Sequence, residues 1–112
     1  MSCIFCSIVD NIIPADRVYE DEYVLAFKDM NPVALFHIII IPKQCCQHFH
    51  NIEDNTLAHL LRAIKIIIQD NNFDNQGYRI VNNNGQHGGQ TVNHVHFHII
   101  AGEQLGHNLA GH

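Results

Sequence analysis

The sequence contains no tryptophan, only three prolines and only six lysines and arginines among its 112 residues. The basic residues form no run and the formal net charge is −5, so the chain lacks the basic surface that polymeric nucleic acid requires. The longest unbroken isoleucine run, residues 38–41, is far too short to cross a bilayer. These absences argue against nucleic-acid polymers and membranes as partners.

Leader, linker, repeat and low-complexity segments are also absent from the sequence. Residues 1–6 have neither the basic nor the apolar region of a signal peptide, so we expect a cytoplasmic protein. The pair Cys3-x-x-Cys6 is then more typical of a reduced metal or redox site than of a disulfide. The length and the 46% hydrophobic content predict a single domain over residues 1–112.

Hydrophobic periodicity predicts an α+β fold with an antiparallel sheet. Strands are expected at residues 17–20, 23–27, 36–41 and 78–81. A turn at Asp21-Glu22 joins the first two, and the unbroken apolar run of the third indicates burial on both faces. Helices are expected at 3–10 and at 53–71, the second with Asn51 as its N-cap. The apolar stripe of the long helix is Leu57, Leu60, Leu61, Ile64, Ile67 and Ile68.

The strongest functional signal is the segment 94–101, in which His94, His96 and His98 alternate with apolar residues. Alternation is the period of a β-strand, so the three imidazoles should share one face and the apolar side chains the other. A rise of about 3.3 Å per residue places neighbouring imidazoles roughly 6–7 Å apart. The three rings are therefore candidates for one site.

A loop rich in asparagine and glycine, residues 82–90, comes directly before that strand. Gly88 and Gly89 would let backbone N–H groups approach an anion, and Gln90 and Thr91 add side-chain donors. An imidazole with the ordinary pKa of about 6.5 has an unprotonated ring nitrogen near pH 7 and can attack phosphorus. A zinc site or surface histidines would explain the histidines alone, but the loop and the histidines together favour phosphate chemistry.

Residues 90–100 (QTVNHVHFHII) resemble the signature of the histidine triad (HIT) superfamily. The segments CIFC at 3–6, IPA at 13–15, FKDMNP at 27–32, His37 ahead of IPK at 41–43, and YRIV at 78–81 occur in the family's order. The chain is most similar to the Hint group of nucleotide-binding phosphoramidases, although residues 90–92 also occur in the fragile-histidine-triad branch. The resemblance implies a HIT-like fold with a five-stranded antiparallel sheet, one long helix and a short N-terminal helix. It also implies a homodimer through the long helix and a sheet edge.

The resemblance implies catalytic roles for four residues. His96 would attack the α-phosphorus of a nucleoside phosphoramidate and form a covalent nucleotidyl-histidine, which water hydrolyses to the nucleoside monophosphate. His98 would contact the phosphate oxygens, and His37 would help order the site. Thr91 stands where a serine is common and keeps its hydroxyl. No cofactor is required for this chemistry.

The resemblance also implies a nucleotide-binding set. Asp29 matches the carboxylate that binds the ribose hydroxyls, and Asn83 matches the phosphate-loop asparagine, although residues 82–84 are all asparagine and allow a slip of one position. Gly89 and Gln90 match positions that contact phosphate. The residues that match an apolar slot for a purine base, for which plain core is the alternative, are Phe5, Ile8, Ile13, Phe27 and Met30.

Cys3 and Cys6 have the spacing of a zinc knuckle. Some bacterial family members complete a structural zinc site with a histidine shortly after the Pro-Lys pair and with the first triad histidine. Because this chain has Cys45 near that position, the resemblance implies a closed zinc site of Cys3, Cys6, Cys45 and His94. The alternatives for the third ligand are Cys46 and His48.

The main functional prediction is therefore hydrolysis of purine nucleoside 5′-phosphoramidates. The alternatives are hydrolysis of dinucleoside polyphosphates, a nucleotide-binding regulatory module and a zinc-stabilised interaction domain. The tail residues His107 and His112 follow no pattern that assigns them a role. Ile66 lies outside the apolar stripe of the long helix and indicates a second buried surface, which agrees with a dimer.

Overall fold

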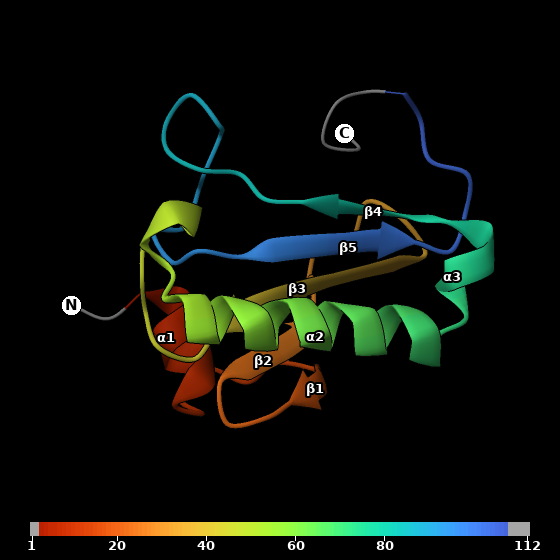
Figure 1. The fold of residues 1–112 in the computed structure, drawn as a ribbon. Helices are drawn as coiled ribbons and strands as arrows, with labels where there is room; N and C mark the ends of the chain where they lie inside the picture. The colour runs from red at the N-terminus through yellow and green to blue at the C-terminus, as the bar shows by residue number, and fades with distance from the viewer. Residues whose placement is uncertain (1–2, 108–112) are drawn as a thin grey trace.

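The structure, a computed structural model, describes residues 3–107 and is built on one antiparallel sheet. The strands are β1 (Arg17–Glu20), β2 (Val24–Lys28), β3 (Phe36–Pro42), β4 (Tyr78–Val81) and β5 (Phe97–Ala101). Their order across the five-stranded sheet is β1-β2-β3-β5-β4 (Figure 1). The predicted α+β class and the antiparallel sheet are confirmed.

The helices are α1 (Ile4–Val9), α2 (Asp54–Asp70) and α3 (Phe73–Gln76), with a 3-10 turn η1 (Phe49–Asn51) ahead of α2. The sequence predicted neither α3 nor η1, because both are too short to show a hydrophobic period. Among the described residues, no helix combines the length and the hydropathy that crossing a bilayer demands.

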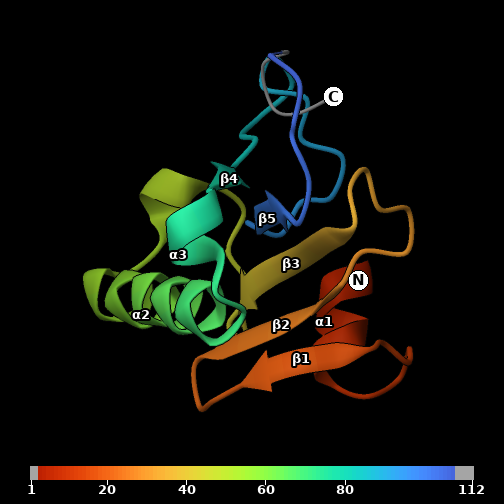
Figure 2. The ribbon, with the colours of Figure 1, turned by 90° about the vertical axis from the view of Figure 1, so that its right-hand side faces the viewer.

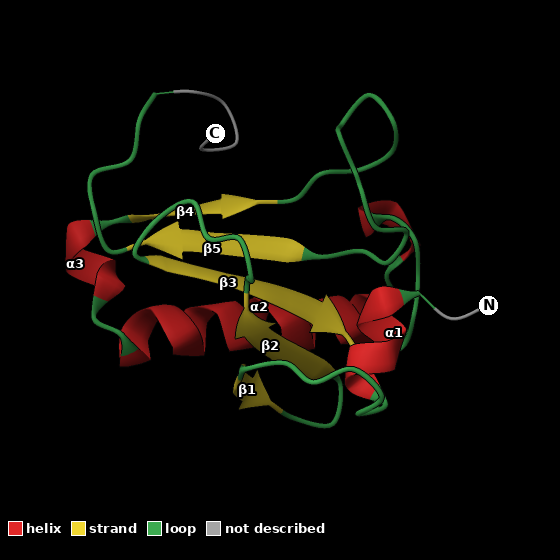
Figure 3. Cartoon of the chain, turned by 180° about the vertical axis from the view of Figure 1, so that it is seen from behind, coloured by secondary structure: helices red, strands yellow, loops and turns green. Residues whose placement is uncertain are grey.

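Helices cover both faces of the sheet, with α2 and α3 on one face and α1 on the other (Figures 2 and 3). On the α2 face, Val24, Ala26, Ile38 and Ile40 pack with the buried stripe of α2. On the α1 face, a second buried cluster is formed by Phe5, Ile8, Leu25, Phe27, Ile39 and Ile41. Strand β3 is thus buried on both faces, as its isoleucine run predicts.

Asp21 shapes the link between β1 and β2. Its Oδ1 accepts hydrogen bonds from the N–H groups of Tyr23 and Val24, both at 2.8 Å, so β2 begins at Val24 and not at the predicted Tyr23. Burial opposes ionisation, but hydrogen bonds from Tyr23, Tyr19 and Val24 lower the pKa of Asp21. The carboxylate therefore holds the turn in its charged form.

Two predictions for α2 are wrong, namely its N-cap and one residue of its buried stripe. Its N-cap is Glu53 and not Asn51, because Asn51 belongs to η1. Leu61 is 48% exposed, while Ala63 is buried in the apolar stripe with Leu60 and Ile64. An α-helix has about 3.6 residues per turn, so consecutive residues are rotated by about 100°, and Leu61 falls at the edge of a stripe that is centred near Leu60 and Ile67.

Strand β5 is shorter than predicted, since it begins at Phe97 and not at His94. Its last pair with β3 is Ile40 with Phe97, and continuing that register would place Pro42 opposite Val95. Pro42 has no N–H to donate, and the N–H of Val95 bonds to the carbonyl of Cys46 at 2.8 Å. The predicted faces are nevertheless kept, because Val95 and Phe97 pack in the α2-face cluster.

Candidate active site

Three histidines meet on the α1 face, where β3 and β5 lie side by side. In the sheet register, His98 lies opposite Ile39 and His37 lies opposite Ile100, so these histidines share a face. The ring centroids of His96 and His98 are 5.2 Å apart, and those of His37 and His98 are 5.0 Å apart. His96 and His37 are buried, and His98 is partly exposed.

The hydrogen bond of His96 defines its neutral tautomer. Its Nδ1 lies 2.8 Å from the carbonyl oxygen of His94, and a carbonyl can only accept. Nδ1 therefore carries the proton, and the lone pair of the neutral ring is on Nε2. Nε2 has no hydrogen-bond partner within residues 3–107. The central histidine thus holds an unprotonated nitrogen ready for bond formation.

His98 has the opposite tautomer, which is set by its hydrogen bond with His37. The N–H of Val33 donates to Nδ1 of His37 at 3.1 Å, so neutral His37 carries its proton on Nε2. That Nε2 lies 2.8 Å from Nδ1 of His98, which accepts, and neutral His98 then carries its proton on Nε2. A nitrogen lone pair on His96 and an N–H donor on His98 are therefore on neighbouring rings.

Asp29 lies beside this histidine pair, a contact that the sequence did not reveal. Its Oδ1 accepts from the N–H of Asn31 at 2.8 Å, while Oδ2 is 3.3 Å from Nε2 of His37 and 3.9 Å from Nδ1 of His98. The carboxylate favours a proton on Nε2 of His37, the nearer of these two nitrogens, which agrees with the tautomer assigned to His37. The donor atoms of Asp29, His37 and His98 lie within 4.8 Å of one another and could also hold a metal ion.

An apolar cavity of about 460 Å³ lies on the same face, between α1 and β2. Its volume is within the range of small-molecule sites. Its lining includes Asp29 and all the residues predicted to form the base slot, which are Phe5, Ile8, Ile13, Phe27 and Met30. The core alternative is also partly true, because Phe5, Ile8 and Phe27 belong to the buried cluster beneath this cavity.

Phe5 connects the cavity to the histidines. Its ring is 5.1 Å from that of His96 and 5.9 Å from that of His94, in both cases edge to face. The same ring packs on Phe27 at 5.6 Å. Phe5 therefore contacts both the cavity, which it lines, and the ring of His96.

The loop ahead of β5 is closed by its own hydrogen bonds. The N–H of Gly89 donates to Gln86 and that of Gln90 donates to Gly85, at 3.1 and 3.0 Å. The Gln90 side chain accepts from the N–H of Gly85 and donates to the carbonyls of Gln47 and Val92. Of the groups expected to bind an anion, the N–H of Gly89 and the side chain of Gln90 are thus already hydrogen-bonded to other described residues.

The three consecutive asparagines, residues 82–84, differ in their hydrogen bonding. Asn82 and Asn84 are hydrogen-bonded to each other and to the backbone. The side chain of Asn83 makes no hydrogen bond with the described residues and is partly exposed. Thr91 is exposed, and its hydroxyl likewise has no partner there. Asn83 and Thr91 are therefore two polar side chains of this loop that a ligand can reach.

A separate cluster of cysteines and histidine lies at the N-terminal end of α1. The ligand atoms of Cys3, Cys6, Cys45 and His94 all lie within 4.8 Å of one another. Sγ of Cys3 is 3.1 Å from Sγ of Cys6 and 3.2 Å from Nδ1 of His94. Ligands of a tetrahedral zinc ion are separated by roughly 3.4–3.8 Å, from bonds of about 2.0–2.3 Å. The four residues could hold a metal ion with small adjustments.

His94 presents its lone pair to this cluster. Its Nε2 lies 2.8 Å from the carbonyl of Pro42, so Nδ1 is the unprotonated nitrogen of the neutral ring. Burial lowers the pKa of His94, and burial together with the thiols of Cys3 and Cys45 raises the pKa of Cys6 to about 12. The alternative third ligands are placed elsewhere, because Cys46 packs on the core and His48 stacks on His50.

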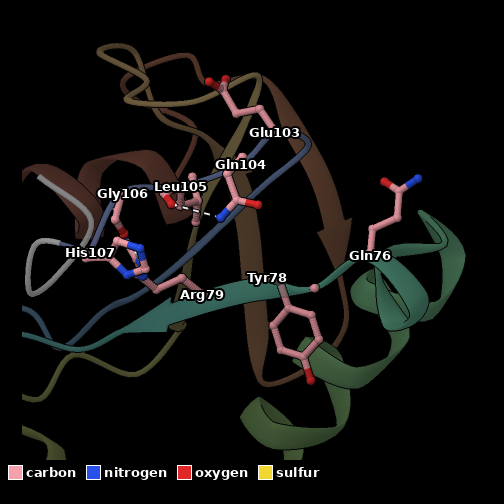
Figure 4. A pocket seen from close by; sticks show the side chains of 9 residues that line it. Gln76, Tyr78, Arg79, Glu103, Gln104, Leu105, Gly106 and His107 are labelled. Carbon is pink, nitrogen blue, oxygen red and sulfur yellow. Dashed lines mark hydrogen bonds between the residues drawn. The ribbon is translucent and has the colours of Figure 1, made fainter.

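A second hollow, of about 240 Å³, lies beside β4 under the C-terminal segment (Figure 4). Its lining includes Tyr78, Arg79, Gln104 and His107. Arg79 donates to the carbonyl of Gly106, which ties the segment to β4, and its Nη1 is buried without a partner among the described residues. His107 thus lines this hollow and not the apolar cavity, and His112 is outside the described residues.

Comparisons with known proteins agree with these features. A family model described as the HIT domain matches residues 11–105. The chain is 48% identical over 101 residues to an uncharacterized HIT-like protein of Methanocaldococcus jannaschii, covering 88% of this chain and 77% of that protein. It is 37% identical over 105 residues to the adenosine 5′-monophosphoramidase HNT1 of Candida albicans, covering 88% and 69%. Its fold is similar to that of a HIT family hydrolase from Legionella pneumophila, with a TM-score of 0.88, 38% identity and coverage of 95% and 97%.

Proposed function

The chain belongs to the HIT family, and from that membership we propose that it hydrolyses purine nucleoside 5′-phosphoramidates through a covalent nucleotidyl-histidine on His96. The observation that carries the proposal is the pairing of an Nε2 lone pair on His96 with an N–H on neighbouring His98, next to Phe5, which also lines an apolar cavity. A monophosphoramidase among the relatives supports the substrate class, and a hydrolase among the structural neighbours supports the type of reaction.

In the first step, Nε2 of His96 attacks the α-phosphorus and the bond from phosphorus to the leaving nitrogen breaks. The leaving nitrogen takes a proton from solvent, while the Nε2–H of His98, whose Nδ1 accepts from His37, donates a hydrogen bond to a phosphate oxygen. As negative charge grows on the phosphate oxygens, the His98 ring stabilises it. The products of this step are a nucleotidyl-His96 and a neutral amine.

In the second step, water attacks the same phosphorus and releases a proton to solvent, while the Nε2–H of His98 again donates to a phosphate oxygen. The bond between phosphorus and Nε2 of His96 breaks, and the nucleoside monophosphate leaves. His96 returns to the tautomer that its bond to the carbonyl of His94 favours. The site is then ready for another turnover, and no metal or cofactor takes part.

The cavity and the loop account for substrate binding. We assign the base to the apolar cavity and the ribose hydroxyls to Asp29, which lines it. Asn83 and Thr91 are assigned to the phosphate and the leaving group, because their side chains have no other hydrogen bond within the described residues. Gly89 and Gln90 hold the loop closed, so a phosphate contact from either N–H requires the turn to open.

We assign the cysteine cluster to a structural zinc ion held by Cys3, Cys6, Cys45 and His94. Three thiolates and an imidazole suit zinc, and four protein ligands leave no position for a substrate. Bound zinc would tie α1 to the loops that follow β3 and precede β5. Thiols in this role need a reducing compartment, which agrees with the cytoplasm.

We also assign a homodimer, formed along β4 and the outer side of α2. Strand β4 is an edge strand of the sheet and exposes Tyr78 and Ile80, which are 45% and 44% exposed. Leu61 on α2 is a further exposed apolar residue. An uncovered apolar edge strand is a ready surface for a second copy.

Trapping the intermediate tests the proposed reaction. The protein is incubated with an adenosine phosphoramidate and quenched in base, because P–N bonds to histidine are acid-labile, and the peptides are examined by mass spectrometry. We expect an AMP adduct on His96 that is lost in His96→Asn and kept in His59→Asn, a histidine on α2 stacked on Tyr23. Faster turnover of a diadenosine polyphosphate would favour that substrate class, and binding of AMP without any adduct would indicate a binding module.

A further inference from the structure

Two asparagine side chains form a continuous hydrogen-bond chain from η1 to the backbone of His96. The N–H of Phe49 donates to Oδ1 of Asn84 at 2.8 Å, and Nδ2 of Asn84 donates to Oδ1 of Asn82 at 2.7 Å. Nδ2 of Asn82 then donates to the carbonyl of His96 at 2.9 Å. These residues flank Asn83, and neither has a part in the reaction described above.

The direction of this chain is set at both ends by backbone groups. An N–H can only donate, so the atom of Asn84 that faces Phe49 is the amide oxygen. A carbonyl can only accept, so the atom of Asn82 that faces His96 is the amide nitrogen. The middle bond, from Asn84 to Asn82, fits both requirements, and flipping either amide would break it. The chain is therefore fully satisfied in one orientation.

His96 depends on such a contact because it lies outside the sheet ladder. Strand β5 begins at Phe97, and the register of β5 with β3 and β4 includes no pair for His96. Just ahead of it, the N–H of Val95 bonds to Cys46. The carbonyl of His96 is held by Asn82, and Nδ1 by the carbonyl of His94. The nucleophile is thus oriented by individual hydrogen bonds and not by strand pairing.

The middle of the chain is held in place by close backbone packing. A Cβ on Gly88 would lie 2.2 Å from the carbonyl oxygen of Asn84, so the loop approaches Asn84 as closely as only glycine allows. Asn84 therefore has little freedom to move away from Asn82. The amide chain is fixed from the loop as well as from η1.

We propose that Asn82, supported by Asn84, is a positioning residue that orients His96 for attack on phosphorus. Neither residue touches the substrate, and both act through the backbone of His96. The inference rests on the proposed function, in which His96 is the nucleophile. A displacement of about 1 Å at a reacting group can slow a reaction by about 100-fold, so this contact acts on kcat more than on binding.

The test is Asn82→Asp, which keeps the shape of the side chain but removes the donor to His96. We expect kcat for an adenosine phosphoramidate to fall by about 10- to 100-fold, while KM and the Kd for AMP change little. Asn75→Asp adds the same charge on exposed α3 and should leave kcat unchanged. An unchanged kcat in Asn82→Asp, or a loss that appears in KM alone, would overturn the proposal.

Two further measurements separate positioning from folding and from the proposed function. Asn84→Asp keeps the acceptor for Phe49 but cannot donate to Asn82, so it should lower kcat less and add little to Asn82→Asp. If the reductions in kcat of the two variants were additive, the two asparagines would not act through one hydrogen-bond chain. Asn84→Asp still tests the proposal if Asn82→Asp does not fold. Nitrogen-15 NMR of the His96 ring should show a smaller Nδ1–H tautomer fraction in Asn82→Asp than in Asn75→Asp. This readout remains decisive if the wild type shows no turnover, a result that would refute the proposed function only.

Discussion

Replacing Gly88 by alanine should disturb the loop and the nucleophile together. The added Cβ would lie 2.2 Å from the oxygen, 2.8 Å from the nitrogen and 3.0 Å from the carbon of the Asn84 backbone. All three are main-chain atoms, so no side-chain rotation can relieve the contact. Gly88 has no positive φ, so the expected strain comes from this contact alone.

The size of the effect follows from these distances. Non-bonded heavy atoms prefer separations of about 3.5 Å, so the loop must move by about 1 Å to accept the methyl group. Overpacking of this kind costs about 1–3 kcal/mol, which lowers the Tm of a domain of this size by about 5–20 °C. Because Asn84 leads through Asn82 to His96, kcat should also fall by about 10- to 100-fold.

Thermal unfolding and steady-state turnover of three glycine variants test this reasoning. Gly106→Ala is the neutral control, because nothing lies within 4 Å of its added Cβ. Gly85→Ala has equally open surroundings but a φ of +68°, so it measures backbone strain alone, about 1–2 kcal/mol. The reasoning is refuted if Gly88→Ala unfolds and turns over like Gly106→Ala.

Three other predictions follow from the structure. Chelation of the proposed metal, or Cys45→Ser, should lower the Tm and raise the Kd for AMP, because α1 and its N-cap supply two of the four ligands, Cys6 and Cys3, and α1 also carries the cavity residue Phe5. Equal Tm values with and without chelator would contradict a structural metal. Asp21→Ala should lower the free energy of unfolding by about 1–3 kcal/mol at pH 7, because the turn loses its acceptor. Since the pKa of Asp21 is lowered in the folded state, this stabilisation is present above pH about 4 and is lost as the pH falls further. The Tm values of wild type and variant should therefore converge at acidic pH. Ile80→Asp should convert a dimer to a monomer in sedimentation experiments, whereas a wild type that is already monomeric would refute the assigned interface.

Features that local patterns dictate could be predicted from the sequence. The isoleucine run of β3 predicts burial on both faces, and alternation places Val95 and Phe97 opposite the histidines. The spacing of Cys3 and Cys6 indicated two candidate metal ligands, and the resemblance to the HIT family added Cys45 and His94; the structure brings these four together and places Cys46 and His48 elsewhere. The strand features follow from the period of the side chains, whereas the full ligand set needed the resemblance.

Features that depend on distant partners could not be predicted. Strand β5 starts late because Pro42, far away in the sequence, offers no N–H to Val95. Three identical asparagines give no local sign of which one stays available to a ligand, since that depends on where Phe49 and His96 lie. The N–H groups of Gly89 and Gln90 are used inside a turn that no periodicity indicates.

His94 takes part in two sites at once, one through its ring and one through its main chain. Its ring belongs to the cysteine cluster, while its main-chain oxygen receives the Nδ1 proton of His96. Occupancy of the proposed zinc site and the orientation of the proposed nucleophile are therefore linked through one residue, so we expect specific activity to vary with the fraction of protein that carries zinc. Batches purified with and without added zinc are comparable only after their metal stoichiometry has been measured.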